Sequence, residues 1–268
     1  MNIGTVFVPA FDISGVEHAA KAALPFVKAS NARLRFGHVK ERFPTGHIAE
    51  HYWHESVVAK FKEDVRLRAE QLRAAATQSV GAHDYEWKEI DDFEEDAYGP
   101  MARAADLVVA PAPAQCGRED AARLLENLLV SCGRPVCIAP SGAEPKAIQS
   151  YLIGWNGSVE ATRAIAAAHP LLTAAKKVLV VSVGEIDGSA PRAEDIAESL
   201  TRSGVAADGK TVQKNGSVTD TLTSEAAAAG LDALLLGAYS HSRLMERVLG
   251  GVTRRLVKDP SMPIVFVH

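Results

Sequence analysis

Residues 231–237 read LDALLLG, and further along the chain residues 250–253 read GGVT. An unbroken apolar run that ends at a glycine is typical of a strand buried on both faces of a parallel sheet. The GGVT step stands at the head of a predicted helix, where the first amides are unpaired and carry partial positive charge. Glycine there removes the Cβ that would keep a phosphate away from the backbone. The two stretches therefore indicate an open α/β sheet with an anion site at its edge, or simply a helix cap and a tight turn.

The chain contains an internal repeat, and this stretch belongs to its second half. Corresponding segments follow one another in the same order in both halves: 6–9 with 151–154, 32–39 with 178–183, 105–110 with 231–236, and 134–139 with 262–267. Such ordered self-similarity indicates a duplicated domain. We place the N-terminal domain at residues 1–142 and the C-terminal domain at residues 150–268. The Pro- and Gly-containing run PSGAEP, at 140–145, is typical of a linker.

In each half, short runs rich in Val, Ile and Leu alternate with alanine-rich amphipathic stretches, a pattern of strands separated by helices. The predicted fold class is α/β, with two tandem doubly wound domains that are each built on a mostly parallel five-stranded sheet. We expect each half to form its own sheet and the two to pack as a pseudo-dimer, with the closing strands pairing across the interface. In the second half the predicted strands are 150–155, 177–183, 209–213, 232–237 and 263–267, and the predicted helices are 158–174, 190–203, 217–229 and 250–258.

The first half carries an additional stretch between its second and third strands, at residues 47–79. Residues 55–76 of this insertion predict one long, charged amphipathic helix. Such an addition can serve as a lid or as a packing surface.

The composition bounds the class of protein. Of the 268 residues, 47% are hydrophobic and the net charge is −4, which argues against a nucleic-acid groove with its clustered basic face. No apolar stretch approaches the roughly 20 residues that span a bilayer, and the N-terminus reads as a strand and not as a signal peptide. Three cysteines without CxxC spacing (Cys116, Cys132 and Cys137) suit a reducing compartment. We therefore expect a cytoplasmic protein that binds neither nucleic acid nor membrane.

The GWNGS step at 154–158, together with Gly237 and the GGVT step, resembles the universal stress protein family, and the whole chain looks like a tandem member of it. The resemblance implies a Rossmann-like fold of the adenine nucleotide α-hydrolase type. Nucleotide-binding members carry the motif G-x2-G-x9-G-[ST] between the fourth strand and the fourth helix. Gly237 and Gly250 match its first and third glycines, Ser240 stands at the second, and Gly251 stands where Ser or Thr is usual.

The same resemblance implies a site for ATP or a related adenine nucleotide in the second half, which Mg²⁺ could accompany. Asn156 stands where the family has an aspartate beside the ribose, and Val183 ends the strand that contacts adenine through its backbone. Thr253 could partly replace the missing hydroxyl. The residues implied to bind the nucleotide are Trp155, Asn156, Val183, Leu236, Gly237, Tyr239, Ser240, Gly250, Gly251, Val252 and Thr253.

The first half departs further from the motif. Pro111 aligns with Gly237 and Ala114 with Ser240, while Ala122 and Arg123 align with the two glycines of the GGVT step. Proline removes an amide donor, and an arginine side chain takes the place where backbone should approach. We expect no phosphate cradle in this half, and so at most one nucleotide per chain.

Other polar groups have simpler explanations. His47, His51 and His54, with Glu50, have helical spacing for a metal site but fit an exposed polar face better. Two aspartates, Asp106 and Asp232, each precede a strand and read as turn residues. We expect no redox role for the cysteines. The acidic run reads as the solvated start of a helix; it comprises Glu86, Glu89, Asp91, Asp92, Glu94, Glu95 and Asp96.

His241, Arg243 and Glu246 follow the predicted phosphate strand, but the sequence offers no convincing base to activate water, so no catalytic residue is assigned. The residues favour a nucleotide-responsive stress or signalling protein without efficient catalysis. Two alternatives stay open: a slow ATP hydrolase or related adenine-nucleotide enzyme, and a ligand-free structural or partner-binding member of the family. A protein partner and a homodimer of tandem chains fit any of the three.

Overall fold

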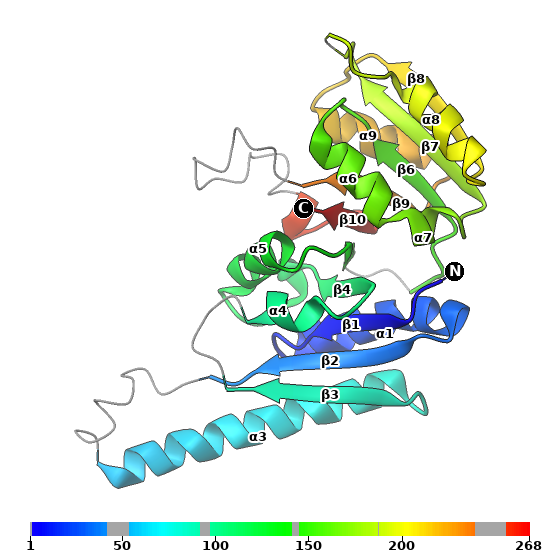
Figure 1. Ribbon diagram of the computed structural model, residues 1–268. Coiled ribbons are helices and arrows are strands. Elements are labelled where there is room, and N and C mark those ends of the chain that lie inside the picture. Colours follow the sequence, from blue (N-terminus) through cyan, green and yellow to red (C-terminus); the bar gives the residue numbers. More distant parts are fainter. Residues whose placement is uncertain (1, 42–53, 92–96, 141–144, 187, 239–255) are drawn as a thin grey trace.

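The chain forms one mixed sheet of ten strands in the order β3-β2-β1-β4-β5-β10-β9-β6-β7-β8 (Figure 1). The computed structural model describes residues 2–41, 54–91, 97–140, 145–186, 188–238 and 256–268. The strands are β1 Thr5–Pro9, β2 Arg33–Val39, β3 Tyr85–Ile90, β4 Leu107–Pro111, β5 Val136–Ala139, β6 Ser150–Gly154, β7 Lys177–Val183, β8 Ala207–Val212, β9 Ala233–Gly237 and β10 Ile264–Val267.

The two halves repeat the same topology, as the sequence repeat predicts. Within each half neighbouring strands are parallel, and β6 to β10 occupy the places that β1 to β5 have in the first half. The closing strands β5 and β10 pair antiparallel, with Ile138 opposite Ile264. The expectation of two separate sheets is wrong, because this pairing joins them into one. Two short apolar edges gain their missing backbone hydrogen bonds by pairing with each other.

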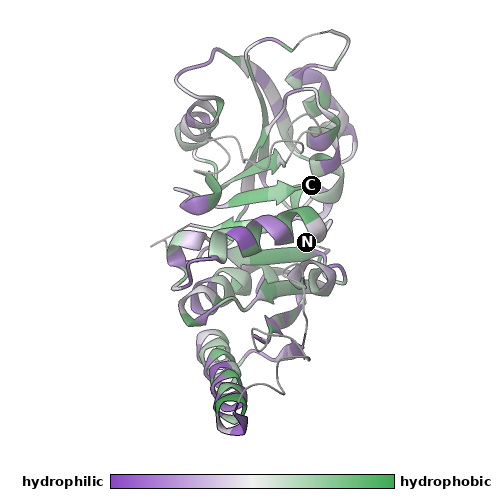
Figure 2. Ribbon diagram, turned by 90° about the vertical axis from the view of Figure 1, so that its left-hand side faces the viewer, coloured by the Kyte–Doolittle hydropathy of each residue, from purple (hydrophilic) through white to green (hydrophobic). Residues whose placement is uncertain are grey.

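Helices cover both faces of the sheet, so each half is doubly wound. The buried residues form one core between the sheet and α1, α3, α6 and α8, and a second core between the sheet and α4, α5 and α9. In Figure 2 the strands between these layers are mostly hydrophobic. The helices are α1 Ile13–Ser30, α3 Glu55–Val80, α4 Tyr98–Ala102, α5 Ala121–Ser131, α6 Val159–Ala167, α7 His169–Leu172, α8 Ala193–Arg202 and α9 Val218–Ala228, with a 3-10 turn at Pro113–Gln115.

The predicted elements of the second half agree with the structure apart from two details. The helix expected at 158–174 is divided into α6 and α7, because Pro170 stands in the first turn of α7 and cannot donate a helical hydrogen bond. Of the helix expected at 250–258, residues 256–258 are described and helical, and the rest lie outside the described residues.

The long charged helix of the first half is α3, the crossover between the parallel strands β2 and β3 (Figure 1). Its counterpart α8 makes the same connection between β7 and β8, with 10 residues against the 26 of α3. The buried residues of α3 all lie between Ala69 and Val80, where α3 packs on α1. In the preceding part of α3, Val57 and Leu67 are exposed. The stretch at 47–79 therefore lengthens a crossover that the fold needs in any case.

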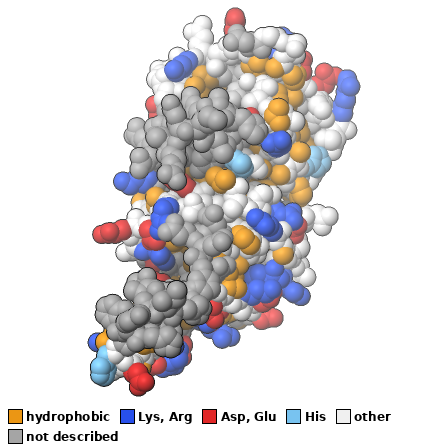
Figure 3. Space-filling view, turned by 60° about the vertical axis from the view of Figure 1, so that its left-hand side comes forward, with side chains coloured by type: hydrophobic (Ala, Val, Ile, Leu, Met, Phe, Trp, Pro, Cys, Tyr) orange, Lys and Arg blue, Asp and Glu red, His pale blue; other side chains and the backbone are white. Residues whose placement is uncertain are grey.

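Charged side chains of both signs are scattered over the face shown in Figure 3, without a single-sign field over the described residues drawn there. None of the helices among the described residues combines the length and the apolar character needed to cross a membrane.

Candidate functional site

The carboxyl ends of β6, β7 and β9 meet at one edge of the sheet, which we call the second-half edge. The three strands are parallel neighbours, with Ile153 of β6 between Val180 of β7 and Leu235 of β9. In this topology the chain leaves β6 and β9 in different directions, which is where open α/β sheets place their ligands. Of the residues predicted to bind a nucleotide, Trp155, Asn156, Val183, Leu236 and Gly237 are described, and all five lie at this edge. Outside the described residues are Tyr239, Ser240, Gly250, Gly251, Val252 and Thr253.

Asn156 builds the turn from β6 into α6. Its side-chain oxygen accepts a hydrogen bond from the amide of Ser158 at 3.1 Å, and Gly157 has a φ of 75°, which suits glycine. The Ser158 hydroxyl then caps α6 by accepting from the amide of Ala161 at 3.1 Å. Asn156 is exposed, so its side chain faces solvent at the edge while its oxygen holds the turn. Asparagine in place of the family aspartate therefore keeps the turn.

Trp155 is a core residue. Its side chain is buried, its indole N–H donates to the Pro191 carbonyl oxygen at 2.8 Å, and its amide donates to Val181. These bonds tie the turn after β6 to the segment that leads into α8. The ring packs within the protein and does not line the edge, so its predicted contact with the nucleotide would have to come through the backbone.

Gly237 stands in close contact with the start of α6. A Cβ built on this glycine would lie 2.7 Å from the carbonyl carbon of Glu160 and 2.8 Å from the amide nitrogen of Ala161. Real Cβ atoms do not approach backbone atoms so closely, so the helix can rest on the strand only with glycine there. The structure thus gives Gly237 a packing reason that holds whether or not a phosphate lies nearby.

An apolar shelf lies beside this contact. A Cβ on Gly154 would meet Leu236 at 2.6 Å and Leu222 at 3.0 Å, so these two side chains fill the space above β6. Val183, at the end of β7, is half-buried and packs on the same core as Leu236. We call these two half-buried apolar side chains, Leu236 and Val183, the apolar shelf; a flat base would need apolar side chains of this kind at the edge.

The described residues contain no cluster of three or more side chains with metal-ligating groups. His54 caps α3 and contacts Ser56, whereas His47, Glu50 and His51 lie outside the described residues. The helix start expected for the acidic run is wrong for its first members: Glu86 and Glu89 are on strand β3. Glu86 pairs with Arg35 at 2.9 Å and Asp91 with Lys40 at 3.1 Å, and the run's remaining members, 92–96, lie outside the described residues.

The cysteines are held as neutral thiols. Burial raises the pKa of Cys137 to about 12, and burial, helped by the charge of Asp12, does the same for Cys116. Burial also raises the pKa of Cys132. Since the thiolate is the reactive form, none of the three side chains is prepared for redox or nucleophilic chemistry.

Asp106 and Asp232 do more than the turn role expected of them. Asp106 accepts hydrogen bonds from the amides of Gly4 and Thr5 at 2.8 and 3.0 Å, at the start of β1. Asp232 accepts from the amide of Gln149 at 3.0 Å and the hydroxyl of Ser150 at 2.8 Å, at the start of β6. Each carboxylate therefore fixes the first strand of its own half to the fourth, and the repeat extends to side chains.

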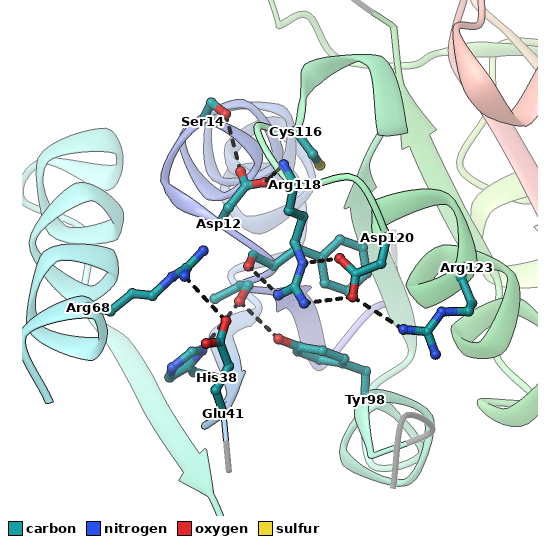
Figure 4. A network of polar contacts seen from close by, with 12 residues as sticks. Asp12, Ser14, His38, Glu41, Arg68, Tyr98, Cys116, Arg118, Asp120 and Arg123 are labelled. Carbon is teal, nitrogen blue, oxygen red and sulfur yellow. Dashed lines mark hydrogen bonds and ion pairs between the residues drawn. The ribbon is translucent and has the colours of Figure 1, made fainter. Parts of the chain in front are cut away.

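A polar network that no sequence motif marks lies at the carboxyl ends of β1, β2 and β4, which we call the first-half edge (Figure 4). Asp12 stands between β1 and α1 and caps the helix by accepting from the amide of Gly15, and an aspartate four residues past Val8 is the signal that could have pointed to it. His38, buried at the end of β2, has its pKa lowered by burial. Burial raises the pKa of Tyr98 to about 12, and its hydroxyl donates to the Ala10 carbonyl oxygen at 3.0 Å.

Comparison with known proteins supports the fold. No family model matches the chain, and no curated protein matches it by sequence. Among solved structures, a universal stress protein from Archaeoglobus fulgidus DSM 4304 is 12% identical, with a TM-score of 0.70 over 98% of this chain and 95% of that chain. A functionally unknown protein from Pseudomonas aeruginosa PAO1 is 11% identical, with a TM-score of 0.52 over 99% of this chain and 92% of that chain. The resemblance expected from the sequence is thus confirmed in the fold: over nearly its whole length, as two tandem halves, the chain is built like a universal stress protein.

Proposed function

We propose that the protein is a nucleotide-responsive regulator that binds one adenine nucleotide at the second-half edge. The observation that carries this proposal is the placement of Asn156 and Gly237 at the adjoining ends of β6 and β9, from which the segment with the GGVT step departs. Ligands of open α/β sheets bind at such an edge. The likeness of the fold to a universal stress protein adds to this support.

In the proposed complex the adenine rests on the shelf of Leu236 and Val183 and contacts the backbone of Val183. The exposed side chain of Asn156 faces the ribose. The phosphates bind the amides of residues 250–253, where two successive glycines permit close approach of the backbone. Mg²⁺, if it accompanies the nucleotide, is held chiefly by the phosphates, since Asn156 supplies no carboxylate.

The proposed protein is not an efficient enzyme. Phosphoryl transfer needs a metal clamp, an oriented nucleophile and charge stabilisation together. Among the described residues no cluster of metal-ligating side chains stands at the edge, and Asn156 replaces an acid by an amide. The slow-hydrolase alternative would depend on His241, Arg243 and Glu246, which lie outside the described residues.

One observation favours the ligand-free alternative. Leu236 and Leu222 already fill the space above Gly154, so part of the edge is packed by the protein itself. If this alternative holds, a protein partner binds an exposed surface, such as the part of α3 before Ala69, which has no buried residue. A homodimer would also need such a surface, because the closing strands pair within the chain. The stress-related role and the cytoplasmic location belong to the proposal in either case.

Mass spectrometry of small molecules released from freshly purified protein tests the proposal. We expect an adenine nucleotide in the released fraction, and we expect it to be absent from a Gly250→Val variant, whose branched side chain would occupy the phosphate approach. Wild-type protein that releases no nucleotide, and binds none when titrated with ATP, would support the ligand-free alternative instead.

A further inference from the structure

At the first-half edge, two loops that are far apart in the sequence lie against each other. One loop follows β1 and carries Phe11 and Asp12, and the other follows β4 and runs from Ala112 to Asp120. Figure 4 shows the side chains of Asp12, Arg118 and Asp120 pointing into the space between the loops. The equivalent place in the second half is the site proposed for the nucleotide.

Side chains of the protein itself accept hydrogen bonds from backbone amides at the first-half edge. The Asp12 carboxylate accepts from the amide of Gly15 at 2.7 Å with one oxygen and from the amide of Arg118 at 3.1 Å with the other. The side-chain oxygen of Gln115 accepts from the amide of Ala112 at 3.1 Å. A carboxylate of the chain thus binds backbone N–H groups as a phosphate would.

The guanidinium of Arg118 bridges the two loops. One of its terminal nitrogens donates to the Phe11 carbonyl oxygen at 3.0 Å, across to the other loop. Its remaining donors bind both oxygens of Asp120, with 2.8 Å between Nη2 and Oδ2. The two side chains are 22% and 31% exposed, so this forked pair is largely shielded from solvent. The planar guanidinium fits both partners at once, which a lysine ammonium cannot do.

The loop after β4 packs closely against the first turn of α1. A Cβ on Gly15 would lie 3.0 Å from the Cys116 sulfur and 3.2 Å from the Pro111 side chain. In the second half the equivalent helix start is capped by Ser158, whose hydroxyl accepts from the amide of Ala161 at 3.1 Å. The carboxylate of Asp12 differs from this hydroxyl cap because it has a second oxygen, which reaches the amide of Arg118 in the other loop.

We propose that Arg118 is the resident internal ligand of the first half: its guanidinium straps the loop after β1 to the loop after β4 and closes this edge to external ligands. The inference concerns the first half alone and holds whether or not the second half binds a nucleotide.

Chemical rescue tests the strap. Replacing Arg118 by alanine removes the guanidinium and leaves Asp120 and the Phe11 carbonyl without this partner, and we expect the melting temperature to fall by roughly 5 °C. Millimolar methylguanidinium should restore much of this loss, because it fits the vacated place, while methylammonium should not. Arg123→Ala is the matched control: Arg123 is exposed and reaches the same carboxylate only at 3.4 Å.

We expect the control variant and the wild type to melt alike, with no response to methylguanidinium. The proposal would be overturned if Arg118→Ala had the same melting temperature as the Arg123→Ala control. It would also be overturned if methylguanidinium raised the melting temperature of Arg118→Ala no more than methylammonium does. Should Arg118→Ala fail to fold, Arg118→Lys decides: it keeps the charge and the stem but loses the fork. A lysine variant as stable as the wild type would contradict a role for the guanidinium, and a clear fall in its melting temperature would support it.

Discussion

Gly237 at the end of β9 lies so close to Glu160 in α6 that an added Cβ would stand 2.7 Å from the Glu160 carbonyl carbon. The helix that begins at the proposed site thus rests on the strand that leads into the predicted phosphate segment. The position of this helix start depends on the glycine, and a change there should move both sides of the site.

Gly237→Ala should therefore destabilise the protein by about 1–3 kcal/mol, since the extra methyl group forces α6 away from the sheet. Urea unfolding measures the change. Gly117→Ala is the control, because its Cβ would meet only the Ser14 hydroxyl oxygen, at 3.9 Å. Equal stability of the two variants would show that α6 does not rest on β9 as described.

The join between the halves should be a source of stability. Ile138 and Ile264 are fully buried and stand opposite each other in the antiparallel pair of β5 and β10. Each change to alanine should cost about 2–4 kcal/mol, and the double variant should lose less than the sum because the two side chains share one packing site. A double-mutant cycle in urea measures this, and strictly additive losses would argue against the pairing.

Asp232 should make the protein sensitive to acid. Burial favours its neutral form, but hydrogen bonds from Lys146, Gln149 and Ser150 outweigh this and lower its pKa. A lowered pKa in the folded state stabilises above the ordinary aspartate pKa, and this contribution is lost as the pH falls through the folded value.

Asp232→Asn should accordingly lose about 1–2 kcal/mol at neutral pH, and its deficit relative to the wild type should shrink in strong acid. Urea unfolding at a series of pH values measures this. Asp208→Asn, at an exposed position on β8, is the control and should change little. A deficit for Asp232→Asn that does not depend on pH would contradict the assignment.

Hydrolysis of ATP should be slow, far below the usual enzyme range of about 1–10³ per second. The reason is that Asn156 offers an amide and not a carboxylate at the second-half edge, so it cannot help to hold a metal ion as an acid would. Steady-state phosphate release measures the rate. Turnover within the enzyme range, lost in His241→Ala or Glu246→Ala with ATP binding retained, would establish the hydrolase alternative.

The sequence predicts most of the fold because its signals are local and occur twice. The apolar runs that became β6, β7 and β9 and the repeated order of segments suffice for two doubly wound halves. The pairing of the closing strands β5 and β10 was expected from their apolar edges and is confirmed, but the expectation that each half keeps a sheet of its own overlooked that this same pairing makes the sheet continuous. Likewise, α3 reads as an insertion because its counterpart α8 is much shorter.

At the second-half edge, the sequence motifs predicted which turns come together. They could not predict which way the side chains point. Trp155 follows the strand at the expected place, yet its ring is buried and bonded to Pro191. Gly237 matches a phosphate motif, yet its lack of a Cβ serves helix packing. The strap of Arg118 joins residues 107 positions apart and belongs to no motif, so only the folded arrangement reveals it.

Isothermal titration with ATP measures how many nucleotides each chain binds. We predict one nucleotide per chain, with binding lost in Gly250→Val and retained in Arg123→Ala, whose change lies in the first half. Two equivalent sites per chain, undiminished binding in Gly250→Val, or no binding by wild-type protein would contradict this prediction.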